Sequence, residues 1–187
     1  MSVIDNSPIN RMERRKIQTH QQLLSAAAQL MLEKSYAVLT IKAITERADL
    51  GYGTFYLHFK DLDDVVWEVV YQMAEEARIE TEKKISGLPF PLREYQSWVY
   101  LFEFAAQWRD GISQLFGRKG SATLLQRYQD YLAALHEDNL RAGNYSSGLD
   151  LPPAFLAQFI TGALVRLLVW WAETPNDYTP QQMADMM

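Results

Sequence analysis

The stretch LTIKAITERADLGYGTFYLHFKDLDDV, residues 39–65, predicts two short helices joined by a tight turn. Thr40 stands directly before a run of apolar residues at helical spacing, and a threonine hydroxyl can cap a helix by accepting an orphan backbone N–H. A helix is therefore predicted to begin at Ile41 and to end near Ala48. Residues 49–51, Asp-Leu-Gly, then interrupt the pattern as a turn does.

The second predicted helix, from Tyr52 to Phe59, carries hydroxyl groups, a histidine and small residues. Gly53 costs roughly 1 kcal/mol relative to alanine inside a helix, so the close approach of another molecule is a reason for it. In a helix-turn-helix, the second helix enters the DNA major groove with its N-terminal residues at the base edges. The predicted base readers are Lys42, Gly51, Tyr52 and Thr54, the predicted phosphate contacts are Tyr56 and His58, and Thr40 and Lys60 complete the predicted set.

Eight residues of this stretch carry a family resemblance. They are Thr40, Ala48, Gly53, Thr54, Phe55, Tyr56, His58 and Phe59. At these spacings they resemble the DNA-binding signature of the TetR family of bacterial transcriptional regulators, over residues 19–65. Two positions depart from the family pattern, because Asp49 stands where glycine is usual and Leu62 where a phosphate-contacting lysine is usual. Lys60 is the candidate replacement for that lysine, and whether it serves as one stays open.

The charge is unevenly distributed along the chain. Residues 1–60 hold eight Lys or Arg against five Asp or Glu, a balance of +3 within a net charge of −5. This asymmetry predicts a DNA-facing N-terminal region on an acidic body. The densest basic cluster, which contains Arg14 and Arg15, lies in residues 1–17. We expect these residues to form a flexible basic arm that reaches phosphates or the minor groove, or else a solubilising tail.

Composition excludes several classes of site. The 187 residues are 48% hydrophobic and contain no cysteine, which suits a well-packed globular protein without disulfides or cysteine-based metal sites. No secretory signal is visible at the N-terminus. We expect a cytoplasmic protein with no cofactor, no metal site and no membrane partner.

All remaining segments are helical in pattern or short breaks, so the predicted fold is all-α. Helices are expected over residues 19–34, from 62 to about 84, 93–109, around 112–116, 122–141, 154–172 and from Pro180, with a loop over 143–153. The resemblance implies an N-terminal three-helix helix-turn-helix unit, residues 18–62. It also implies a larger helical domain for effector binding and dimerisation, residues 63–187.

Residues 154–172 are nearly apolar, and their length suggests a membrane span. Arg166 at the centre argues against it, and a helix that is apolar on almost every side is more simply buried against both its own core and a second subunit. The predicted interface residues are Phe155, Phe159, Gly162, Arg166 and Trp170. A homodimer would present two recognition helices to a palindromic operator.

The resemblance further implies a small-molecule effector. Aromatic residues abundant enough to line an apolar cavity follow residue 97, although each of them also suits a core. The predicted lining residues are Trp98, Phe102, Trp108, Phe116 and Tyr128, and the expected effector is small and hydrophobic or aromatic. The family pattern favours a repressor that the effector releases from double-stranded DNA.

Two other classes of protein compete with this interpretation. An enzyme is disfavoured because His136 lacks the second histidine of a zinc helix motif, and no phosphate loop, dinucleotide fingerprint or nucleophile elbow is present; no catalytic residue is predicted. A helical adaptor with a vestigial helix-turn-helix, acting through protein partners, is the main alternative. The leucine at position 62 supports that alternative.

Overall fold

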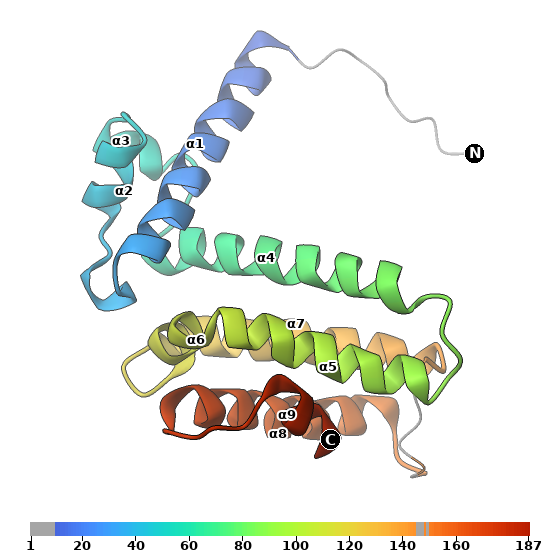
Figure 1. Cartoon of the computed structure of the whole chain (residues 1–187). Coiled ribbons are helices and arrows are strands. Elements are labelled where there is room, and N and C mark those ends of the chain that lie inside the picture. The colour runs from blue at the N-terminus through green and yellow to red at the C-terminus, as the bar shows by residue number, and fades with distance from the viewer. Residues whose placement is uncertain (1–9, 145–147, 149) are drawn as a thin grey trace. The chain divides into compact units, whose positions relative to one another are not determined.

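A computed structural model of the chain describes residues 10–144, 148 and 150–187, and within these ranges it contains helices and no β-strand (Figure 1). This confirms the predicted all-α fold. The elements are α1 (Arg11–Glu33), the 3₁₀ helix η1 (Tyr36–Val38), α2 (Ile41–Arg47), α3 (Tyr52–Phe55), α4 (Leu62–Ile85), α5 (Leu92–Gln107), α6 (Arg109–Phe116), α7 (Ala122–Arg141), α8 (Pro153–Glu173) and α9 (Pro180–Asp185). Part of the predicted loop 143–153, namely residues 145–147 and 149, lies outside the described residues.

The helices form two packed units. Of the described residues, the first unit contains 10–34 and 38–69, and the second contains 35–37, 70–144, 148 and 150–187. The sequence predicts a boundary at residues 62/63, the start of α4, whereas packing divides α4 itself. The physical reason is that the first two turns of α4 bury Val65, Val66 and Val69 in the first unit.

The helix-turn-helix begins where the sequence predicts. The Thr40 hydroxyl accepts the backbone N–H of Ala43 at 3.1 Å and caps α2 at Ile41. Asp49 adopts a left-handed conformation with φ 54°, and it is the sole non-glycine residue with positive φ in the described ranges. Aspartate tolerates this conformation better than most residues, so the turn is kept without the glycine usual in the family.

The second helix of the motif is shorter than predicted. Helix α3 ends at Phe55 and Tyr56 is its C-cap, although the sequence predicts a helix to Phe59. From there the backbone closes three-residue turns, with Leu57 N–H donating to Thr54 O at 3.2 Å and His58 N–H to Phe55 O at 2.9 Å. Such 3₁₀-type bonds tighten the last turn of a helix.

The expected basic arm is wrong for residues 11–17, because α1 starts at Arg11 and includes both Arg14 and Arg15. Asn10 and Glu13 form a capping box, in which the Asn10 side chain accepts Glu13 N–H at 2.9 Å and Glu13 accepts Asn10 N–H at 3.1 Å. This reciprocal cap satisfies two orphan donors and begins the helix early. Residues 1–9 of the predicted arm lie outside the described residues.

The second unit is built around a core shared by α5, α7, α8 and α9. Helix α8 packs against α7 and α6, and α9 packs against α5 (Figure 1). The buried members of the core are Val99, Phe102, Ala105, Leu132, Leu164, Val165, Leu168, Trp171, Met183 and Ala184. Helix α9 buries Met183 and Ala184 in its own unit, so these two side chains are not available to a second subunit.

Helix α8 is long and apolar enough to cross a membrane by length and composition. Eight of its residues are nevertheless buried in the unit: Leu156, Ala157, Thr161, Leu164, Val165, Leu168, Val169 and Trp171. Burial in a protein core accounts for its apolar character, as the sequence predicts for one of its two faces.

Candidate DNA-binding surface and ligand cavity

Two tyrosines of the helix-turn-helix form an exposed pair. The side chains of Tyr52 and Tyr56 are 54% and 50% exposed, and their hydroxyl oxygens lie 3.1 Å apart. This hydrogen bond raises the pKa of the Tyr56 hydroxyl above its ordinary value of 10. Tyr56 therefore stays protonated at neutral pH and keeps a hydroxyl donor that a phosphate can accept.

His58 lies half-buried beside a second histidine. Its ring is 5.6 Å from that of His20, and His20 Nε2 lies 2.7 Å from Glu68 Oε1. Burial, followed by the charges of His20 and Lys16, lowers the pKa of His58. The imidazole is thus mainly neutral in the free protein, and a bound phosphate would favour its protonation.

The basic cluster of α1 meets α3 at one surface hollow. The residues that line it come from the N-terminal half of α1 and from α3 with the turn after it: Arg15, Lys16, Thr19, Thr54, Leu57 and His58. The structure thereby brings Arg15 together with Thr54 and His58, whereas Arg14 is exposed on α1 and does not line the hollow. We call this hollow, together with Tyr52 and Tyr56, the α1/α3 surface.

Gly53 has no intramolecular reason to be glycine. A Cβ atom built on Gly53 would meet nothing within 4 Å, and its backbone φ is not in the left-handed range. Glycine at this position therefore costs helix stability without relieving a contact inside the chain. This supports the expectation that another molecule approaches the backbone there. Gly51 caps α3 without a side-chain hydrogen bond and is exposed.

The remaining predicted DNA contacts differ in availability. The hydroxyl of Thr40 is engaged in capping α2. Lys42 is exposed, and its ion pair with Glu46 at 3.7 Å is a surface pair of little energetic weight. Lys60 is also exposed, but the side chain of Asp64 accepts its backbone N–H at 3.0 Å, so an acidic group lies beside it. Leu62 is half-buried at the first position of α4.

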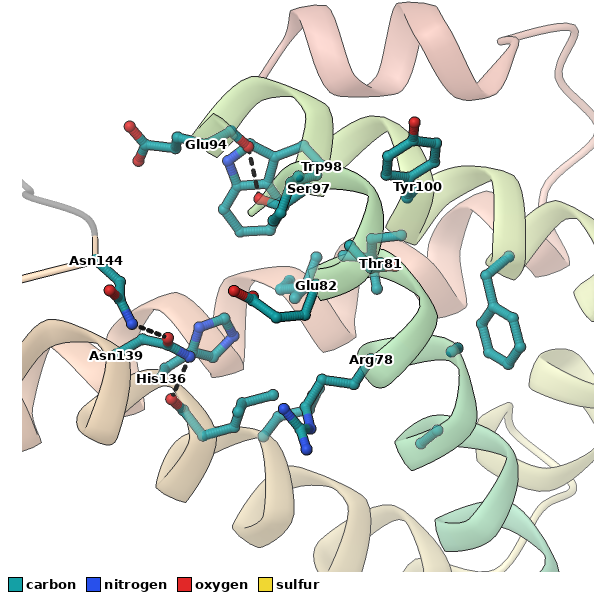
Figure 2. A pocket seen from close by; sticks show the side chains of 18 of the residues that line it. Arg78, Thr81, Glu82, Glu94, Ser97, Trp98, Tyr100, His136, Asn139 and Asn144 are labelled. Atoms are coloured by element: carbon teal, nitrogen blue, oxygen red, sulfur yellow. Dashed lines mark hydrogen bonds between the residues drawn. The ribbon is translucent and has the colours of Figure 1, made fainter. Parts of the chain in front are cut away.

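The second unit contains a cavity of about 240 Å³ between α4, α5 and α7 (Figure 2). Its lining includes five aromatic side chains: Trp98, Tyr100, Phe104, Tyr128 and Tyr131. Burial raises the pKa of Tyr128 to about 12, so this hydroxyl is neutral. Burial also lowers the pKa of His136 to about 4, which makes the imidazole a neutral hydrogen-bonding group of the wall.

Two of the five predicted cavity residues, Trp98 and Tyr128, line this cavity, and the other three do not. Phe102 is fully buried and packs edge-on against Trp171, with ring centroids 5.8 Å apart. Phe116 is stacked on Tyr128 at 4.9 Å, and Trp108 is the C-cap of α5. The structure therefore places these three aromatic rings in the core or at the end of a helix, outside this cavity.

Nine polar or charged lining residues were not predicted. They are Arg78, Thr81 and Glu82 on α4, Arg93, Glu94 and Ser97 at the start of α5, His136 and Asn139 on α7, and Asn144 after α7. A local signal for His136 exists, because it lies four residues after Leu132 and so shares an apolar helical face with it. The charged second half of α4 offers no comparable signal.

Four of the predicted interface residues share an exposed face of α8. Phe155 and Phe159 are 58% and 67% exposed, and Gly162 and Arg166 follow at helical spacing, also exposed. Trp170 is half-buried, with its ring centroid 6.2 Å from that of Tyr178. We call Phe155, Phe159, Gly162 and Arg166 the outer face of α8.

Known proteins resemble the chain in both units. The family profile described as bacterial regulatory proteins, tetR family, matches residues 23–69, and that of a transcriptional regulator C-terminal region matches residues 95–187. The HTH-type transcriptional regulator HbdR of Aromatoleum sp. (strain CIB) is 30% identical over 88 residues, 46% of this chain and 38% of HbdR. The match thus spans about two fifths of the length of that curated relative.

Solved structures share the fold over nearly the whole chain. A TetR-family transcriptional regulator from Syntrophomonas wolfei str. Goettingen superposes with a TM-score of 0.67 at 21% identity, covering 91% of each chain. The structure of RolR in complex with resorcinol gives a TM-score of 0.66 at 20% identity, covering 92% of this chain and 89% of RolR. At these identities the likeness is one of fold.

Proposed function

Because the chain belongs to the TetR family of bacterial transcriptional regulators, we propose that it is a homodimeric repressor that a small effector releases from a palindromic operator. The observation that carries this proposal is the α1/α3 surface. It gathers cationic, hydroxyl and imidazole groups from two segments that lie about 40 residues apart in the sequence. Such groups contact phosphates. A repressor acts on DNA in the cytoplasm, which is the proposed location.

The phosphate contacts can be tested by mutation. Exchange of Tyr56 for Phe together with His58 for Ala should weaken binding to every duplex by about tenfold or more, because each removed group donates to a charged acceptor. Tyr178→Phe, a change in the second unit, is the control. Fluorescence anisotropy on a duplex selected from a random pool measures the effect. Full affinity in the double variant would contradict the assignment.

Cations of α1 should appear in the salt dependence of binding. Each phosphate contact contributes a slope of about −0.9 to the dependence of log affinity on log salt concentration. Arg15→Ala with Lys16→Ala should therefore make the slope shallower by up to about 2. An unchanged slope would show that α1 does not contact phosphates.

Substitutions at the predicted base readers should have a different effect. Lys42→Ala or Thr54→Ala should change which DNA sequence the protein prefers.

The outer face of α8 supports dimerisation. Two exposed phenylalanines beside Gly162 form an apolar face on which a second copy can pack closely. A two-fold dimer would place the recognition helices on half-sites about 34 Å apart or a multiple of this. Phe159→Asp should produce monomers in sedimentation experiments, whereas Phe90→Asp, at another exposed site, should not. A dimer that persists in Phe159→Asp would exclude this face.

The cavity supports effector binding, because it is enclosed by aromatic walls and contains a few polar groups. An effector acts if it prefers the arrangement of the dimer that cannot bind DNA. Small aromatic compounds, beginning with resorcinol, should stabilise the protein against heat and lower its DNA affinity. Trp98→Ala should abolish the response and Trp108→Ala should retain it. Equal responses in both variants would place the effector elsewhere.

A further inference from the structure

The charged side chains that line the cavity are not equally available to a ligand. What they imply about that ligand rests on the proposed role of the cavity as the effector site. Arg78 is paired with Glu75, since its guanidinium donates to Glu75 Oε2 at 2.8 Å through Nη2 and to both Glu75 oxygens through Nε at 3.1 and 3.2 Å. Tyr131 adds a hydrogen bond to Glu75 Oε1 at 2.6 Å. The positive charge of Arg78 is therefore neutralised by its neighbour.

Two further charges lie at one end of the cavity. Arg93 donates to the carbonyl oxygen of Asn144 at 3.3 Å. Glu94 is next to it in sequence, and Figure 2 shows its carboxylate pointing away from His136. The backbone oxygen of Glu94 accepts the hydroxyl of Ser97 at 2.6 Å. The acceptor of Arg93 is a neutral carbonyl, so the positive charge of Arg93 is retained at this end of the cavity.

The carboxylate of Glu82 lies on the α4 side of the cavity wall. Figure 2 shows it projecting into the space between Trp98 and His136. Among the residues that the structure describes, none forms an ion pair or hydrogen bond with it: Lys83 and Lys84 pair with Glu80 instead, each at 3.9 Å. Arg78 interacts electrostatically with Glu82, but the carboxylate oxygens of Glu82, an exposed residue, stay free to accept a hydrogen bond from a bound molecule.

The aromatic side chains that line the cavity also favour a positively charged ligand. The face of an aromatic ring is electronegative and attracts a cation within about 6 Å of the centroid. The chain itself provides an example, because the ammonium of Lys84 lies 4.9 Å from the ring centroid of Tyr100, one of the lining residues. His136, neutral at physiological pH, does not repel a cation.

We infer that the cavity takes a small organic cation, whose ammonium group pairs with the carboxylate of Glu82 and whose apolar body lies against Trp98. The volume of about 240 Å³ is below the range of about 300–1,000 Å³ of typical ligand pockets, so the body is no larger than a single ring with a short chain. An anion bound against Trp98 would meet the like charge of Glu82.

Calorimetry on the full-length protein near neutral pH tests the sign of the charge. The probes are 2-phenylethylammonium, the neutral 2-phenylethanol and the anionic 3-phenylpropionate, which share a ring and a short chain. The ammonium compound should bind about tenfold more tightly than either of the others, as a charge-assisted hydrogen bond implies. Failure of the ammonium compound to bind, or equal or tighter binding of the anion, would overturn the inference.

A matched pair of variants tests the role of the carboxylate. E82Q should lose up to about fivefold in affinity for 2-phenylethylammonium, as an exposed ion pair implies, while E76Q should bind it as the wild type does. Glu76 is exposed on the same helix, does not line the cavity and undergoes the same change of charge. Equal losses in both variants, or no loss in E82Q, would overturn the inference.

DNA anisotropy with the same probes separates this inference from the proposed function. If 2-phenylethylammonium binds through Glu82 and DNA stays bound, the cation site stands and the effector role of the cavity fails. If 3-phenylpropionate binds more tightly and releases DNA, the effector role stands and the cation site is wrong.

Discussion

Acidification from pH 7 to pH 5 should destabilise this protein through a single buried histidine. His136 is 7% exposed, and burial lowers its pKa from the ordinary 6.5 to about 4. Below pH 6.5 the unfolded imidazole binds a proton that the folded one does not. The stabilisation is therefore fully present above pH 6.5 and is lost as the pH falls towards 4.

The magnitude follows from the two pKa values. At 1.36 kcal/mol for each pH unit, the difference between 6.5 and about 4 corresponds to about 3 kcal/mol of unfolding free energy. About 2 kcal/mol of this loss should have occurred by pH 5, where the unfolded imidazole is almost fully protonated and the folded one mostly neutral. Such a loss is a large fraction of the stability of an ordinary domain.

Urea unfolding of the wild type and of His136→Gln at pH 7 and pH 5, followed by tryptophan fluorescence, measures the effect. Each protein is compared with itself, so the cost of the substitution cancels, as do the titrations of all other groups. The wild type should lose about 2 kcal/mol more than the variant between the two pH values. Equal losses would show that His136 titrates normally, and the account of its burial would be wrong.

Five further substitutions, at four positions, test the fold and its surfaces. Gly53→Ala should raise the unfolding free energy by about 0.5–1 kcal/mol in urea titrations and yet lower DNA affinity in anisotropy; unchanged affinity would mean that DNA does not approach this backbone. Asp49→Ala should lower the unfolding free energy by about 1 kcal/mol, because alanine is strained at the φ of 54° that residue 49 adopts, whereas Asp49→Gly should be tolerated. Equal stability of the two variants would show that this backbone conformation is not strained. Phe102→Ala should lower the unfolding free energy by about 3–5 kcal/mol. Phe159→Ala, at an exposed site, should leave the unfolding free energy of the monomer nearly unchanged and weaken only the dimer. A large loss of monomer stability in Phe159→Ala would contradict the exposure of Phe159.

The features predicted correctly in the helix-turn-helix depend on atoms close together in the chain. The Thr40 hydroxyl accepts the N–H of the third residue after it, and Asp49 adopts the left-handed conformation of the turn. Interactions of this range are encoded by residue type and spacing, so the sequence is sufficient to locate them.

The sequence contains a local pattern for the start of α1, but the basic residues beside it led to the prediction of a flexible arm. Asn10 followed three residues later by Glu13 is the pattern of a capping box. The run of arginines and lysine next to it suggested an arm, although charge alone does not prevent a helix. The consequence is functional, because a helix holds Arg15 and Lys16 beside Thr54 and His58.

The residue types and their spacing, taken alone, determined the all-α fold, the helix-turn-helix with its caps and turn, and the family. Only tertiary structure decided which aromatic side chains line the cavity and which charge there is open. Trp98 and Phe102 lie four residues apart on one stripe of α5, yet the first lines the cavity and the second meets Trp171 in the core. Local periodicity assigns a side chain to a helix face, but the partner that covers that face comes from a distant segment, and no nearby residue specifies it.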